Sequence, residues 1–134
     1  MTVSTIEIQN ASIVLGMLCD IEGIAYNQTR EDIFEVRGPE GFSCLIDVEP
    51  TLVCIASEIC DVPEDESKQF LLFKYLLELN HQAVHGKFSS DGKKVYFKEN
   101  LEIANLDLNE LEAALGWTLG MVKQGVEKIS TIVE

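Results

Sequence analysis

The chain has 134 residues, of which 46% are hydrophobic and 25% are charged, and these values are ordinary for one globular domain. An excess of Asp and Glu over Lys and Arg gives a net charge of −13 and a pI of about 4.4. This charge argues against nucleic acid and anionic membranes as partners, because binding to either needs Lys and Arg near phosphate. It favours a basic or amphipathic polypeptide partner, although solubility through self-repulsion explains the charge equally well.

Neither targeting signals nor disulfide motifs stand out along the chain. No run reaches the roughly 18 apolar residues that span a membrane, and the first residues lack the basic region of a secretory signal. The four cysteines form no C-x-x-C pair and lie among apolar residues, which is typical of free thiols in a reducing compartment. We therefore expect a cytoplasmic protein with a single domain over residues 1–134.

The first half of the chain predicts one helix followed by closely spaced strands. Residues 10–22 have the apolar spacing of an amphipathic helix, and Gly23 is a natural helix stop. Residues 27–32 are polar and are interpreted as a link. Strands this close together in sequence must pair antiparallel, because parallel neighbours need a long crossover. The predicted strands are residues 33–37, 42–48 and 52–59.

A second helix, predicted at residues 64–80, is apolar around most of its circumference. A helix on the surface of a monomer carries an apolar stripe on one side only, and a chain this small has little interior in which to bury a whole helix. We therefore expect one side to pack on the chain's own sheet and the other on a second copy of the chain. The alternative is a central helix covered by its own neighbours. The residues expected at the subunit contact are Phe70, Phe73, Leu76 and Leu77.

A hairpin and a long helix complete the predicted fold. Residues 84–90 and 93–98 flank an Asp-Gly pair, which is a strong hairpin signal, and residues 101–106 either extend the second strand or form a short extra one. The last helix starts at Asp107, with a capping-box Glu three residues later and apolar residues every three or four positions. The predicted class is α+β, with three helices and a single antiparallel sheet of about five strands in the order α-βββ-α-ββ-α.

The sequence contains no recognisable catalytic or metal-binding motif. His81 and His85 have the i, i+4 spacing of helical metal ligands, but the change from helix to strand falls between them and no third ligand is evident. The motifs of serine hydrolases, nucleotide-binding loops and zinc proteases are missing. We therefore predict a protein without enzymatic activity, metal or cofactor.

Strand alternation predicts an apolar patch on the solvent side of the sheet. If the Phe, Cys, Ile and Val positions of the second strand face the helices, then Ile33 and Leu45 face outward. An outward apolar patch on a very acidic protein suits an amphipathic, partly basic peptide. Single exposed apolar residues are nevertheless common on soluble proteins.

Two segments resemble a known family. Residues 70–115 (FLLFKYLLELNHQAVHGKFSSDGKKVYFKENLEIANLDLNELEAAL) resemble the apolar helix, short G-K-F strand, hairpin and acidic-start helix of the class I type III secretion chaperones, which include a CesT-like group and YbjN-like relatives. Residues 15–26 (LGMLCDIEGIAY) resemble the end of the family's first helix, its glycine and the aromatic residue that follows. The resemblance implies a dimer without catalytic activity that binds an extended segment of a client protein.

Two other classes of function remain open from the sequence. The sheet and the last helix can enclose a pocket for a small molecule, as in a sensing or regulatory module. The apolar helix can instead contact a different protein, as in a subunit of a larger assembly.

Overall fold

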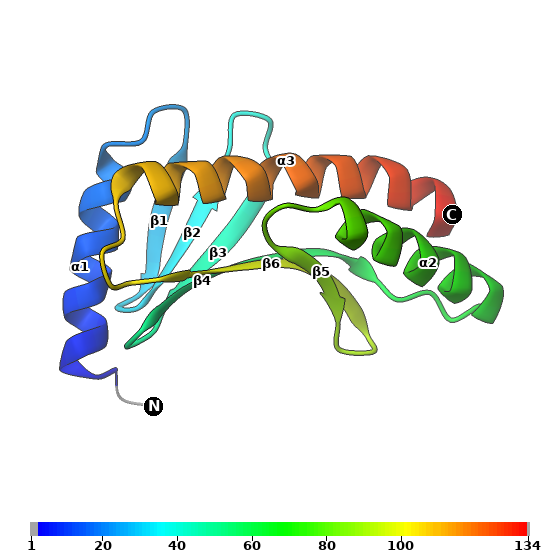
Figure 1. The fold of residues 1–134 in the computed structure, drawn as a ribbon, viewed down its shortest axis with the longest axis horizontal. Helices are drawn as coiled ribbons and strands as arrows, with labels where there is room; N and C mark the ends of the chain where they lie inside the picture. The colour runs from blue at the N-terminus through cyan, green and yellow to red at the C-terminus, as the bar shows by residue number, and fades with distance from the viewer. Residues whose placement is uncertain (1–2, 134) are drawn as a thin grey trace.

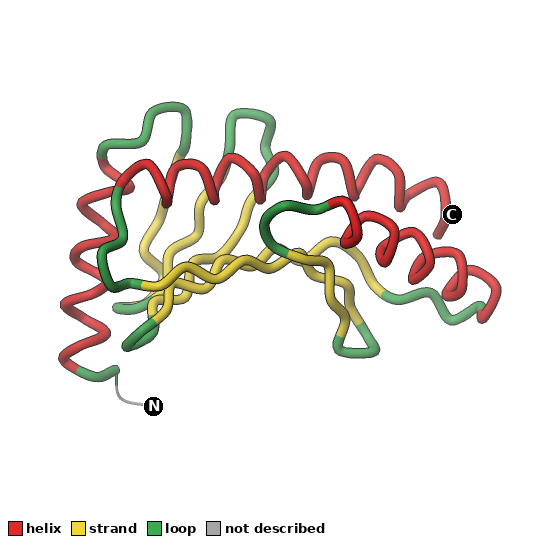
Figure 2. The backbone as a smooth tube through the Cα atoms, in the orientation of Figure 1, coloured by secondary structure: helices red, strands yellow, loops and turns green. Residues whose placement is uncertain are grey.

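The computed structural model describes residues 3–133 and shows a six-stranded antiparallel sheet with three helices (Figure 1, Figure 2). The strand order across the sheet is β1-β2-β3-β4-β6-β5, so the chain leaves the sheet after β4 and returns through the far edge strand. The α+β class and the order of helices are confirmed, and the sheet has one strand more than the expected five. The elements are α1 (Thr5–Cys19), β1 (Ala25–Arg30), β2 (Ile33–Arg37), β3 (Ser43–Val48), β4 (Leu52–Asp61), α2 (Glu66–Gln82), β5 (Lys87–Ser90), β6 (Lys94–Glu102) and α3 (Leu108–Val133).

The additional strand is β1, which occupies most of the segment interpreted as a polar link. All six of its residues are exposed, and it pairs with β2 alone, as an edge strand. A strand that buries neither face has no apolar alternation, so sequence periodicity does not reveal it. Pairing with β2 stabilises β1 through backbone hydrogen bonds rather than through side-chain burial.

Two helices begin at polar caps that fix their first turns. In α1 the Ser4 hydroxyl accepts from the Glu7 amide at 3.2 Å, as an N-cap does, and donates to the Glu7 carboxylate at 2.9 Å. This cap starts α1 five residues before the predicted position 10, and the helix ends at Cys19 rather than at 22. At α3 the carboxylate of Asp107 accepts from the Glu110 amide at 2.8 Å, which confirms the predicted cap.

The second helix and the hairpin also follow local chemistry. The Asp65 carboxylate accepts from the Ser67 amide at 2.8 Å, so α2 begins two residues later than predicted. At the hairpin, Asp91 accepts from two following amides, and Gly92 adopts a positive φ of 95° that suits glycine. For residues 101–106, the structure shows an extension of the second hairpin strand over the first two residues only, because β6 ends at residue 102 and residues 103–106 form no strand.

The hydrophobic interior divides into two clusters that α3 connects. Figure 1 shows α3 running along the whole length of the molecule, with α1 at one end and α2 at the other. The N-terminal core packs α1 and the first half of α3 on β2, β3 and β4, and its centre contains Leu18, Phe34, Ile46, Ile55 and Leu111. The C-terminal core packs α2 and the second half of α3 on β5 and β6, and its centre contains Leu72, Phe88, Phe97, Val122 and Ile129.

All three helices lie against one face of the sheet, which leaves the other face open to solvent. On β3 the buried positions alternate with Ser43, Leu45 and Asp47, which point to the open face. No helix within residues 3–133 is long and apolar enough to cross a membrane.

Candidate protein-binding surfaces

The outward face of α2 carries large apolar side chains with no cover from the chain itself. Phe70 is 67% exposed and Leu77 is 69% exposed, and they lie on one stripe of the helix two turns apart. Phe73, one turn before Leu77, is partly buried at the flank of this stripe. Leu71 and Val84 add further exposed apolar surface on and just beyond the helix. A group of exposed apolar residues on one helix is typical of a protein-binding surface.

The structure places the four predicted subunit-contact residues at different depths. Phe70 and Leu77 point outward, Phe73 lies at the boundary, and Leu76 is only 5% exposed within the chain's own C-terminal core. Leu76 therefore supports the helix from below, and only the other three present surface to a partner. We call Phe70, Phe73 and Leu77 the α2 stripe.

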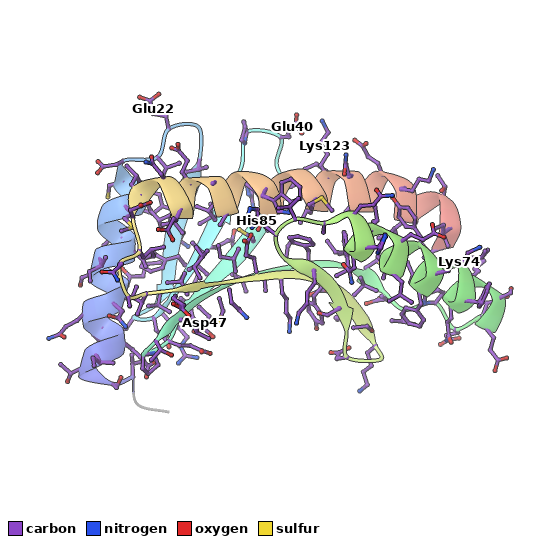
Figure 3. All side chains as sticks on the ribbon, viewed as in Figure 1. Glu22, Glu40, Asp47, Lys74, His85 and Lys123 are labelled. Atoms are coloured by element: carbon purple, nitrogen blue, oxygen red, sulfur yellow. The ribbon has the colours of Figure 1, made fainter. Side chains whose placement is uncertain are left out.

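A shallow hollow lies beside the α2 stripe. It measures about 390 Å³ and is formed between Leu77 and the polar side chains of Lys74, Glu78 and His81. Figure 3 labels Lys74 on α2. Both signs of charge are present around it, so charge alone does not prevent a second acidic chain from approaching here.

The open face of the sheet carries the second predicted surface. Leu45 on β3 is 48% exposed, and Ile33 on the neighbouring strand β2 is half-buried on the same face. Leu45 lies opposite Ala56 of β4, and a hollow of about 300 Å³ lies here between Glu35 and Tyr96. The predicted outward orientation of both side chains is observed, but the role in partner binding stays a prediction.

A third feature, which the sequence analysis did not identify, is the partly unpaired edge of β6. The short strand β5 pairs only with residues 95–98, whereas β6 continues to residue 102. The segment at 99–102 therefore pairs with β4 on one side only. Two hollows meet at this edge, one of about 710 Å³ along β5 and one of about 370 Å³ beneath the start of α3, and both are lined by His85 and Glu99.

Glu99 points to the core side of the sheet, where few hydrogen bonds or opposite charges replace the water that its carboxylate loses. It is 8% exposed, and its Oε2 atom has no hydrogen-bond partner among the described residues. The Nδ1 atom of His85 lies 3.9 Å from Oε1, beyond hydrogen-bond distance. Burial raises the pKa of Glu99, and the attraction of His85 opposes that shift in part.

The register of β6 shows which of its residues face the core, and this pattern identifies Glu99. The core-facing positions of the strand are Val95, Phe97, Glu99 and Leu101, so one carboxylate interrupts an apolar row. The strand was predicted at residues 93–98 with a possible extension at 101–106, and no role was assigned to Glu99 between them.

The loop before β5 holds His85 close to this edge. Gly86 has a φ of 69°, and a Cβ atom there would lie 2.6 Å from the Phe97 ring and 2.9 Å from the Lys98 carbonyl oxygen. Only glycine lets the loop approach β6 this closely. Trp117 of α3 donates its indole N–H to the His85 carbonyl at 2.7 Å, which fixes the loop from the other side.

Burial affects three of the four cysteine thiols, and the two histidines occupy different segments. Burial raises the pKa of the Cys44 thiol to about 12 and also raises those of Cys54 and Cys60, which keeps these thiols protonated at neutral pH. His81 belongs to α2 but His85 follows the end of the helix, so the two imidazoles do not share a helix face. Within residues 3–133, no group of three or more His, Cys, Asp or Glu residues is arranged to hold a metal ion.

Comparison with known proteins identifies the family. The model of the CesT_Tir_1 family matches residues 9–128, which is nearly the whole chain. The chain therefore belongs to the CesT_Tir_1 family, as the resemblance in residues 15–26 and 70–115 predicted. No curated protein matches the sequence significantly.

Three solved structures share the fold. An uncharacterized protein from Methanothermobacter thermautotrophicus is similar with a TM-score of 0.66 and 13% identity, over 93% of this chain and 99% of that one. The ExsC–ExsE complex contains a chain that is similar with a TM-score of 0.55 and 16% identity, over 95% of this chain and 96% of that one. YbjN, a putative transcription regulator from E. coli, is similar with a TM-score of 0.56 and 16% identity, over 91% of this chain and 87% of that one.

Proposed function

We propose that the protein is a chaperone-like, non-catalytic homodimer that binds an extended or amphipathic segment of a client protein. The observation that carries this proposal is the uncovered α2 stripe in a chain of the CesT_Tir_1 family. The similarity to a chain of the ExsC–ExsE complex supports a role in binding another protein. The cytoplasmic location expected from the sequence stays a prediction.

The α2 stripe suits a twofold contact between two copies. In such a dimer, residue i contacts residue j and residue j contacts residue i. Phe70 and Leu77 are seven residues apart, which is about 10 Å along a helix. Two antiparallel α2 helices therefore bring Phe70 of each copy over the hollow beside Leu77 of the other.

The client segment is proposed to bind on the open face of the sheet. Leu45 and Ile33 supply apolar contact there. The carboxylates of Glu35 and Glu58, which form ion pairs with the exposed Arg37 and Lys94, border the central hollow. Such a surface fits a segment that combines apolar residues with Lys or Arg. The net charge of −13 favours the approach of the same class of segment.

Native mass spectrometry of the whole chain tests the dimer. We expect a dimer for the wild type and a folded monomer for the double variant Phe70→Asp, Leu77→Asp. The matched control is Ile13→Asp on α1, which is 50% exposed and should leave the dimer intact. A wild-type protein that stays monomeric at tens of micromolar, or a double variant that stays dimeric, contradicts the proposal.

Client binding is tested by affinity co-purification with quantitative mass spectrometry. We expect one near-stoichiometric protein with the wild type and at least tenfold less of it with Leu45→Asp, while Ile13→Asp retains it. Equal capture by the Leu45 variant rules out the open face of the sheet. Capture of a different protein through the α2 stripe, with no homodimer, supports the hetero-assembly instead.

A further inference from the structure

We propose that the edge of β6 holds a binding pocket for a lysine or arginine side chain, with Glu99 as the carboxylate that receives its charge. The pocket is the hollow of about 370 Å³ between β6 and the start of α3. Its assignment to a side chain of a bound polypeptide rests on the proposed function.

The buried carboxylate is the first argument. An acid that is 92% buried without a full set of partners is costly, since the charged form loses water and gains little in return. Within the described residues, the only basic group within 4.0 Å of Glu99 is the exposed imidazole of His85. Lys87 and Lys98 are opposite each other in the register of β5 and β6, on the face of the sheet away from Glu99. An incoming cation therefore supplies the missing partner.

The shape and chemistry of the pocket are the second argument. Leu101 from β6 and Ala113 and Ala114 from α3 form an apolar wall, while Asp107 and Glu110 add two more carboxyl groups at the start of the helix. An alkyl stem with a cationic end matches this combination, because Lys and Arg bury their methylene groups along apolar surface. A neutral ligand can donate a hydrogen bond to Glu99 but supplies no counter-charge, and an anionic ligand would be repelled by it.

The unpaired backbone is the third argument, and it favours a polypeptide over a free amine. In the segment at 99–102, every second residue directs its backbone N–H and C=O groups away from β4. These groups have no partner strand, because β5 begins at Lys87, which is opposite Lys98. An extended peptide that pairs with this edge places alternate side chains toward the core side of the sheet, which is the side of Glu99.

The probe is a capped pentapeptide with the sequence Ser-Val-Arg-Val-Ser, compared with the same peptide carrying citrulline, the neutral isostere of arginine. Trp117 is the only tryptophan and contacts the His85 carbonyl, so its fluorescence and amide NMR shifts of the dimer report binding. We expect saturable binding of the arginine peptide and at least tenfold weaker binding of the citrulline peptide.

The variant Glu99→Gln should lose the preference for arginine and bind both peptides equally weakly. The matched control is Glu22→Gln, an exposed carboxylate in the loop between α1 and β1, away from the pocket, which should bind as the wild type does. Equal binding of both peptides by the wild type, or unchanged discrimination in Glu99→Gln, overturns the pocket. Agmatine binding as tightly as the arginine peptide overturns the assignment to a polypeptide.

This outcome can be separated from that of the proposed function. If the client still binds but arginine and citrulline peptides are indistinguishable, only the pocket is wrong. If the pocket selects arginine but no client is retained, the pocket stands as a cation site and the chaperone-like function is wrong.

Discussion

In the N-terminal core, α1 and α3 cover the sheet, and fully buried residues outnumber the partly buried residues around them. In the C-terminal core, partly buried apolar residues outnumber the buried ones. Here α2 also exposes Phe70 and Leu77 to solvent. The C-terminal core is also richer in aromatic side chains, among them Phe88, Phe97 and Trp117, whereas Phe34 is the aromatic residue of the N-terminal core. The difference indicates that the chain completes one core by itself and leaves the other for a partner to complete.

The largest expected effect lies in the closed core. Leu18 on α1 is fully buried, and Leu18→Ala should lower the free energy of unfolding by about 3 kcal/mol through lost burial and a residual cavity. The dimer should persist, because α1 is remote from the α2 stripe (Figure 1). Urea unfolding and native mass spectrometry check both parts, and a monomeric but stable variant would contradict the division into two cores.

The next largest effect is expected in the loop between α2 and β5, which packs closely against β6 at Gly86. Gly86→Ala should destabilise by about 2 kcal/mol, because the residue keeps a positive φ and its Cβ would contact Phe97 and the Lys98 backbone. Gly23→Ala is the matched control, since Gly23 also has a positive φ but open space around it, and it should lose about 1 kcal/mol. Thermal unfolding measures the stability of both variants. An equal loss of stability in the two would show that the close approach of the Gly86 loop to β6 does not add to the cost of the substitution.

A smaller effect is expected at the α2 stripe. Leu77→Ala removes apolar surface from the proposed contact without disturbing the core, and it should weaken the dimer about tenfold, or about 1.4 kcal/mol. Analytical ultracentrifugation over a dilution series measures this change. Ile13→Ala provides the control, and a similar weakening by that variant would place the contact elsewhere.

The smallest effect concerns Glu99 and pH. Because burial raises its pKa, the folded state binds this proton more tightly than the unfolded state does, and ionisation of Glu99 destabilises the fold as pH rises above its ordinary value of 4.5. Glu99→Gln should therefore be more stable than the wild type by up to about 1 kcal/mol at pH 7.

The advantage of Glu99→Gln should shrink as pH falls toward 4, where the wild-type carboxyl is protonated in both states. The other ionisable groups at the pocket, His85, Asp107 and Glu110, are unchanged in the variant. Melting temperatures from pH 4 to pH 8 measure the trend, and a difference independent of pH would show that the charge of Glu99 is not its source.

Local sequence signals predicted most of the helices and the hairpin. Asp107 with Glu110 marks the start of α3, and Asp91 with Gly92 marks the turn before β6, because each uses hydrogen bonds within a few residues. The same rule would have found the start of α1 at Ser4 and Glu7. The edge strand β1 was missed because its side chains are exposed and its backbone pairing with β2 leaves no apolar alternation in the sequence.

The candidate surfaces were predicted less completely than the elements. Alternation indicated that Leu45 and Ile33 point outward, and the structure shows this orientation. Helix periodicity could not separate Leu76 from Leu77, because α2 is apolar nearly all round and the burial of each side chain depends on where β5 and β6 lie. The position of Glu99 depended on how far β6 extends, which local propensity does not specify.

The sequence by itself determined the α+β class, the order of the helices and the family, because apolar periodicity and capping residues act over short stretches of chain. Only the tertiary structure decided which side of α2 is exposed, how β1 joins the sheet and why the β6 edge remains partly unpaired. These properties depend on contacts between residues distant in sequence, so they follow from strand order and register rather than from any local pattern.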